Sequence, residues 1–95
     1  MNPEETGGVG EELPVLGREE VTAKLRERLA GRLDAKALAA WAYARFYEEE
    51  MEQLSLEPGA DDLLREVLDE LMFADDETFA LDDDALRALL TRLQP

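Results

Sequence analysis

Apolar residues recur along most of this chain at intervals of three and four positions, the spacing of one face of an α-helix. The pattern predicts a helix over residues 18–30 that Gly31 ends and a helix over residues 61–73. A last helix is capped by Asp82 or Asp83 and ends near Leu93. Their apolar stripes are Val21, Leu25 and Leu29 in the first, Leu64, Val67, Leu68, Leu71 and Met72 in the second, and Leu86, Leu89, Leu90 and Leu93 in the last.

The longest predicted helix covers residues 35–54, with Asp34 as its N-cap. Its apolar stripe consists of Ala39, Tyr43, Phe46, Tyr47 and Leu54, with Met51 at the edge. The stripe spans more than a third of the circumference, as expected of the central helix of a bundle. We therefore expect the three aromatic residues of this stripe to lie in the core.

The remaining segments predict turns, a loop and a tail. Residues 55–60 contain Pro58-Gly59 and form a turn, and residues 74–81 form an acidic loop from which Phe79 and Leu81 fold back onto the core. Residues 1–17 hold four of the six glycines and have no helical period, so we predict a flexible tail that orders locally around residues 13–16. No strand pattern is evident. The expected fold is all-α, an antiparallel four-helix bundle over residues 18–95 with a flexible N-terminal tail.

Composition removes the residues on which most catalytic sites depend. The chain has no Cys, which excludes a disulfide, a thiolate metal site and a thiol nucleophile. It has no His, the commonest general base and zinc ligand, and its only serine is Ser55. We therefore predict a binding protein that is not an enzyme and that needs no cofactor.

No apolar run approaches the roughly 18 residues of a membrane span. Residues 1–8 (MNPEETGG) are acidic and lack the charged and apolar regions of a signal peptide. These features predict a soluble cytoplasmic protein without a membrane partner.

The net charge of −14, from 24 acidic and 10 basic residues, is unevenly distributed. Residues 18–45 carry seven basic and four acidic residues, whereas residues 46–95 carry three basic and sixteen acidic ones. Nucleic-acid binding requires clustered Lys and Arg, so direct binding of nucleic acid is not expected. A basic protein is the partner that this charge predicts.

Several acids lie where a helix dipole disfavours them. The last turns of the helix predicted over residues 35–54 contain Glu48, Glu49, Glu50 and Glu52. The end of residues 61–73 is followed by Asp75, Asp76 and Glu77. Arg45 can pair with only one of the nearby glutamates. Such a cost without a structural return indicates a binding site, although charge runs are more often solvated faces.

The acidic clusters and Trp41 each fit more than one role. Neither acidic triplet, residues 75–77 or 82–84, has the glycine of an EF-hand loop, so no metal site is expected. Catalysis by paired carboxylates needs a cleft that a small bundle does not offer. Trp41 shares a helical strip with Arg45, Glu48 and Glu52. It is either an interface anchor or a residue buried beneath the first helix together with Leu38.

Four segments follow one another in a recognisable order: residues 33–38 (LDAKAL), 40–46 (AWAYARF), 67–75 (VLDELMFAD) and 81–90 (LDDDALRALL). In pattern and order they resemble the colicin D-type immunity proteins and the related small immunity proteins of contact-dependent inhibition systems. The resemblance runs from Gly31 to Leu93 and covers about two thirds of the chain. It implies a four-helix bundle that binds and neutralises a bacterial nuclease toxin, such as one that cuts tRNA, with acidic side chains in place of substrate phosphates.

On this hypothesis the partner-binding residues are Trp41, Glu48, Glu49, Glu52, Glu57, Asp62, Glu66, Asp69, Asp75, Asp76 and Glu77. The alternative is a non-catalytic helical interaction module or small subunit whose acidity serves only solubility. Apolar stripes that are not fully buried against one another within a single chain would indicate a homodimer. Whether DNA or RNA is mimicked stays open at this point.

Overall fold

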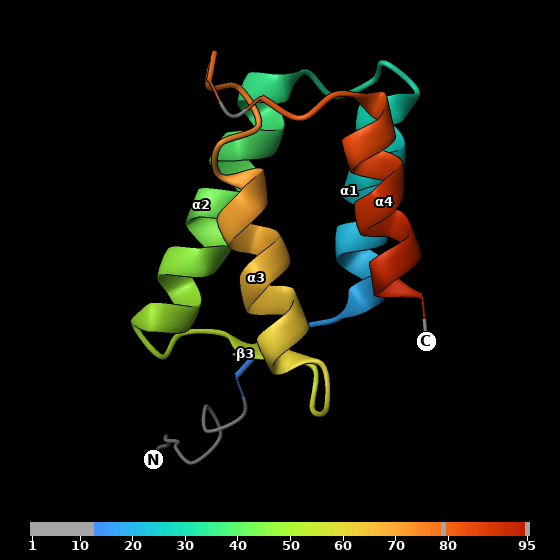
Figure 1. Ribbon diagram of the computed structural model, residues 1–95. Coiled ribbons are helices and arrows are strands. Elements are labelled where there is room, and N and C mark those ends of the chain that lie inside the picture. The colour runs from blue at the N-terminus through green and yellow to red at the C-terminus, as the bar shows by residue number, and fades with distance from the viewer. Residues whose placement is uncertain (1–12, 79, 95) are drawn as a thin grey trace, which may run out of the picture.

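The computed structural model describes residues 13–78 and 80–94 of the chain and contains four helices (Figure 1). They are α1 (Arg18–Leu29), α2 (Ala35–Glu50), α3 (Asp61–Leu71) and α4 (Asp83–Leu93). Two short strands, β2 (Val15–Leu16) and β3 (Ser55–Leu56), complete the described elements. The predicted all-α, four-helix fold is confirmed.

The helices form two antiparallel pairs, α2 with α3 and α1 with α4, which stand side by side in Figure 1. One apolar cluster joins them, because α1, α3 and α4 turn their apolar stripes inward and α2 contributes Leu38, Ala39 and Ala42. The side chains of Leu25, Leu38, Leu68 and Leu86, one from each helix, are almost completely buried in this cluster. Burial of each such side chain contributes about 1.5–3 kcal/mol relative to exposure.

The helix boundaries are set by local hydrogen bonds. Asp34 and Asp82 cap α2 and α4 as predicted, since their carboxylates accept from the backbone N–H of Ala37 at 2.7 Å and of Ala85 at 2.8 Å. Gly31, with φ +79°, ends α1 in the left-handed conformation that glycine adopts without a steric penalty.

α2 ends at Glu50, four residues before the predicted end at Leu54. Glu52 adopts a left-handed φ of 60°, and the backbone N–H of Gln53 donates to the carbonyl of Glu48 at 2.8 Å. This is the Schellman pattern of a helix C-terminus. It frees Leu54 to enter the core outside the helix.

The chain after α2 forms a strand pair that the sequence did not predict. β3 pairs in parallel with β2, Val15 opposite Ser55 and Leu16 opposite Leu56. Leu16 is 1% exposed and belongs to the core. The local order expected around residues 13–16 is therefore confirmed, while residues 1–12 of the predicted tail lie outside the described residues.

The predicted buried face of α2 was wrong for its two tyrosines. Tyr43 is 61% exposed and Tyr47 is 52% exposed, whereas Leu38, Ala39 and Ala42 are buried. The small alanine side chains allow α3 to pack closely, and the tyrosine hydroxyls remain in water. Phe46 is half-buried and packs against the core, as does Leu81 from the acidic loop. Phe79 lies outside the described residues.

A candidate acidic groove along α3

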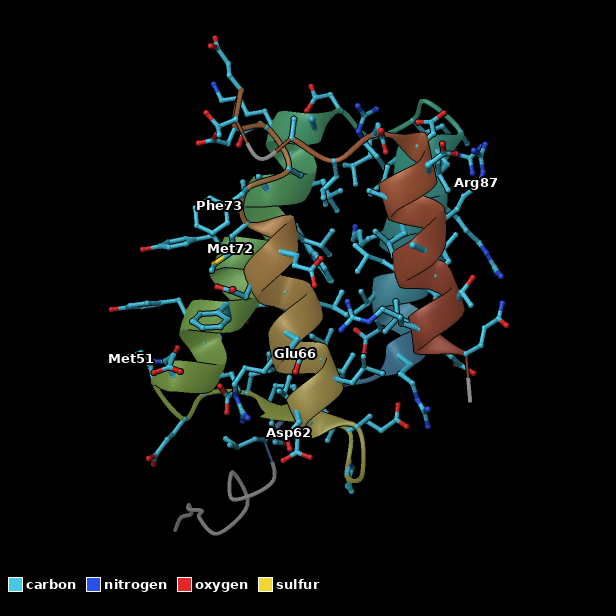
Figure 2. The ribbon with its side chains drawn as sticks, viewed as in Figure 1. Met51, Asp62, Glu66, Met72, Phe73 and Arg87 are labelled. Carbon is cyan, nitrogen blue, oxygen red and sulfur yellow. The ribbon has the colours of Figure 1, made fainter. Side chains whose placement is uncertain are left out.

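The two sides of α3 differ in character. Leucine and valine fill its inward side, and acidic residues occupy its outward side. Asp62, Glu66 and Asp69 follow one another at intervals of four and three residues, so they form one ridge. Figure 2 shows Asp62 and Glu66 on the outward side of α3. All three residues are exposed.

Two hollows with apolar side chains in their walls meet at Asp69. In the first, of about 380 Å³, Phe46 of α2 lies among Asp62, Arg65, Glu66 and Asp69. The second, of about 390 Å³, is lined by Asp69, Glu70, Phe73, Ala80 and Leu81. We refer to the two hollows together as the α3 groove. Its carboxylates surround aromatic rings, a combination suited to a side chain with an apolar stem and a cationic head.

Glu66 and Glu70 are tied to α4 by one arginine. The Arg92 guanidinium donates to Glu66 at 2.8 Å and to Glu70 at 2.9 Å. These side chains remain well exposed, and ion pairs in such positions contribute only about 0–1 kcal/mol. Asp69 forms no ion pair within residues 13–78 and 80–94. Asp62 is paired with Arg65 at 3.4 Å and is also exposed. The groove therefore offers one carboxylate that is unpaired, Asp69, and three that can exchange partners at little cost.

Two of the predicted site residues at the end of α2 have ion-pair partners within the chain. Arg45 donates to Glu48 from Nε and Nη2, both at 2.7 Å, which lowers the pKa of Glu48 and raises the pKa of Arg45. Arg65 donates from Nη2 to Glu49 at 3.0 Å, and this bond raises the pKa of Arg65. The expectation that these acids lack a structural return was wrong, since each pair offsets the unfavourable helix dipole. Arg65 also lines the groove, whereas Glu49, which it binds, does not.

Glu57 lies at the junction between β3 and α1 and holds the two together. Its carboxylate accepts from the backbone N–H of Arg18 at 2.9 Å and from the Arg18 guanidinium at 2.9 and 3.2 Å. The backbone hydrogen bond first, and then the guanidinium, lower the pKa of Glu57. Glu57 and Glu52 thus belong to the connections on either side of β3 and do not line the α3 groove.

The other predicted residues lie outside the ridge. Asp75, Asp76 and Glu77 follow α3, and the Asp76 carboxylate accepts from the backbone N–H of Thr78 at 2.7 Å, which closes a turn. Trp41 is half-buried against the core, and Lys24 of α1 lies 5.8 Å from its ring centroid. The structure therefore brings together Asp62, Glu66 and Asp69 and separates them from Trp41 and Glu57.

Six residues that line the groove were absent from the sequence-based site: Phe46, which was assigned to the core, Arg65, Glu70, Phe73, Ala80 and Leu81. The four-residue spacing of Asp69 and Phe73 was a signal that an aromatic side chain continues the acidic ridge. Phe46 gave no such signal, because its half-burial depends on how α2 packs on α3.

Within the described residues, no three acidic side chains are placed to hold a metal ion. None of the described helices is long and apolar enough to cross a membrane.

No family model, curated protein or solved structure matches this chain. The charge and shape of the α3 groove are therefore the basis on which a function is inferred.

Proposed function

We propose that this protein is a non-catalytic inhibitor that binds a basic protein at the α3 groove, and that its partner is a bacterial nuclease toxin in the cytoplasm. The proposal gives the chain the role of an immunity protein, in line with the resemblance of residues 31–93. It assigns no catalytic residue and no cofactor to the chain.

One observation carries the proposal: the ridge of Asp62, Glu66 and Asp69 lies beside aromatic side chains. A lysine or arginine of a partner can lay its aliphatic stem against Phe46 or Phe73 while its charged head meets Asp69. A purely solvating acidic surface needs no such apolar walls. This combination of contacts fits the basic residues with which a nuclease binds phosphates.

The electrostatic field around the groove supports the same partner. Residues 61–77 contain eight acidic residues and one basic residue, Arg65. A field of one sign accelerates the association of an oppositely charged protein and disfavours other acidic proteins. Arg92 can release Glu66 or Glu70 when a partner guanidinium replaces it, because the pairs are exposed.

A second candidate function has its own observation. Glu48, Glu49 and Glu57 are each held by an arginine of the same chain, so part of the acidity serves the fold. On this alternative the protein is a helical interaction module or small subunit, and the remaining carboxylates only keep it soluble.

The test uses the protein encoded immediately upstream as the probe. Its C-terminal domain is expressed with and without this chain, and growth and intact tRNA are measured. The proposal predicts toxicity that this chain relieves, and a complex whose affinity falls at least tenfold between 50 and 300 mM NaCl. If the upstream-encoded domain is harmless, or if it is toxic and this chain does not relieve the toxicity, the nuclease-inhibitor proposal is overturned. Either result favours the interaction module.

The groove itself is tested with two variants of equal charge. The first carries Asp62→Asn, Glu66→Gln and Asp69→Asn, and the second carries Glu19→Gln, Asp83→Asn and Asp84→Asn outside the groove. The proposal predicts that the first loses at least tenfold in affinity and the second less than threefold. Equal losses in both variants would mean that net charge acts without a groove.

A further inference from the structure

The outward face of α2 is mainly apolar, although it points away from the core. Tyr43, Tyr47 and Met51 are each more than half exposed and follow one another at intervals of four residues. The two tyrosine rings stack with their centroids 6.3 Å apart. Ala37 and Ala40 are exposed on the same side, as helical geometry places them, and only Lys36 and Glu50 contribute charge there.

The same side of the molecule continues onto α3. Figure 2 shows the side chains of Met51, Met72 and Phe73 along one edge of the α2–α3 pair. Phe73 is 45% exposed, and Met72 is half-buried against the core. Such a run of exposed aromatic and methionine side chains on a chain of net charge −14 is typical of an interaction surface.

We propose that this face binds a second copy of the chain, with the two α2 helices antiparallel and the two-fold axis at Tyr43. The reason is that the face is complementary to itself. Lys36 lies seven residues before Tyr43 and Glu50 lies seven residues after it, so all three share one ridge. The two-fold axis therefore places Lys36 of each copy level with Glu50 of the other.

Charge and size both favour this register. Neither Lys36 nor Glu50 has an ion-pair partner in the described part of the chain, so both are available to a second copy. The alanine-rich start of α2 lies opposite the tyrosine-rich end of the second helix. Tyr47 then lies level with the start of the second helix, where the small side chain of the exposed Ala40 leaves room for its ring.

The size of the face predicts a weak dimer. A helix of 16 residues is about 24 Å long, so α2 alone supplies less than the usual area of a stable interface. Met72 and Phe73 widen the contact. We expect a dissociation constant in the micromolar range, and dimerisation that strengthens with salt because two copies of charge −14 repel each other. Binding of a basic partner at the α3 groove has the opposite salt dependence.

Sedimentation equilibrium of the full chain between 5 and 200 μM, in 50 and 500 mM NaCl, tests the proposal without any partner. A monomer–dimer equilibrium that shifts toward dimer in 500 mM NaCl is expected. A monomer at 200 μM in both salts overturns the proposal, and it does so whatever the fate of the proposed function.

Substitutions test the face and its register. Tyr43→Asp places like charges together at the axis and should abolish the dimer, whereas Ala88→Asp adds the same charge to an exposed position of α4 and should not. Lys36→Glu and Glu50→Lys should each weaken the dimer at least fivefold, and the double variant should restore it. Glu50→Lys is the sharper test, because it lowers the net negative charge and would otherwise favour association. Single variants without effect, or a double variant that is not restored, would contradict the antiparallel register. Far-UV circular dichroism shows that each variant is folded.

Discussion

Arg18 and Glu57 connect the first turn of α1 to the residue that follows β3. Three hydrogen bonds join them, one from the Arg18 backbone and two from its guanidinium, across 39 positions of the chain. A Cβ added to Gly17 would approach Glu57 Oε1 to 3.1 Å, so the carboxylate fills the space that Gly17 leaves open. This contact fixes the entry into α1 and with it the position of β2.

The stabilisation by Glu57 should depend on pH in a defined window. The hydrogen bonds from Arg18 lower the pKa of Glu57 below the ordinary value of about 4.3. Its contribution is therefore complete above that ordinary value and is lost as the pH falls through the lowered pKa of the folded state. Glu57→Gln should reduce the free energy of unfolding at pH 7, and the difference from the parent chain should shrink as the pH falls below the ordinary pKa of a glutamate. Urea denaturation at pH 7, 5 and 3 measures this.

Glu19→Gln is the control for this prediction. Like Glu57→Gln it removes one negative charge, but Glu19 lies in the first turn of α1 and has no hydrogen bond to Arg18 among those of the described residues. It should change the stability at pH 7 less than Glu57→Gln. A difference between Glu57→Gln and the parent chain that is the same at pH 7 and pH 3 would show that the Arg18–Glu57 hydrogen bonds do not depend on an ionised carboxylate.

The end of α2 gives a second prediction, which concerns the backbone of Glu52. Its φ of 60° lies in the region that side chains with a Cβ occupy at a cost of roughly 1–2 kcal/mol. Glu52→Gly should therefore raise the free energy of unfolding by about 1 kcal/mol, after the greater freedom of glycine in the unfolded chain is allowed for. Glu52→Gln separates charge from conformation because it keeps the Cβ. Equal gains from both variants in urea denaturation would assign the effect to charge alone.

The leucine stripes, the two aspartate caps and the stop at Gly31 could be predicted because each depends on residues close in sequence. The face of α2 could not. Its tyrosines and its alanines both fit an apolar stripe, and the choice between them is made by how closely α3 approaches. Trp41 illustrates the same limit, since its contact with Lys24 exists only after α1 packs on α2.

The candidate site was predictable only in part for the same reason. The ridge of Asp62, Glu66 and Asp69 follows from helical spacing, and the structure places these residues together. The pairing of Glu49 with Arg65 and of Glu57 with Arg18 joins residues 16 and 39 positions apart. A count of charges along the sequence does not distinguish carboxylates that are paired with an arginine of the same chain from carboxylates that are available to a partner.

The residues before α1 give the third prediction, because they were assigned to a tail and yet enter the core. Leu16 is 1% exposed, whereas Val15, its neighbour in β2, is 52% exposed. Neighbouring residues of a strand point to opposite sides, so one side chain packs into the protein and the other meets water.

Leu16→Ala should therefore lower the free energy of unfolding by about 2–4 kcal/mol, through the lost burial and the cavity left behind. Val15→Ala is the matched control and should cost less than about 1 kcal/mol, since little buried area is lost. Both values come from urea denaturation at pH 7. Two equally small losses would mean that β2 is dispensable and that the folded domain begins at α1. A large loss for Leu16→Ala alone would establish that the domain includes the residues before Arg18, held by the β2–β3 pair and by Glu57.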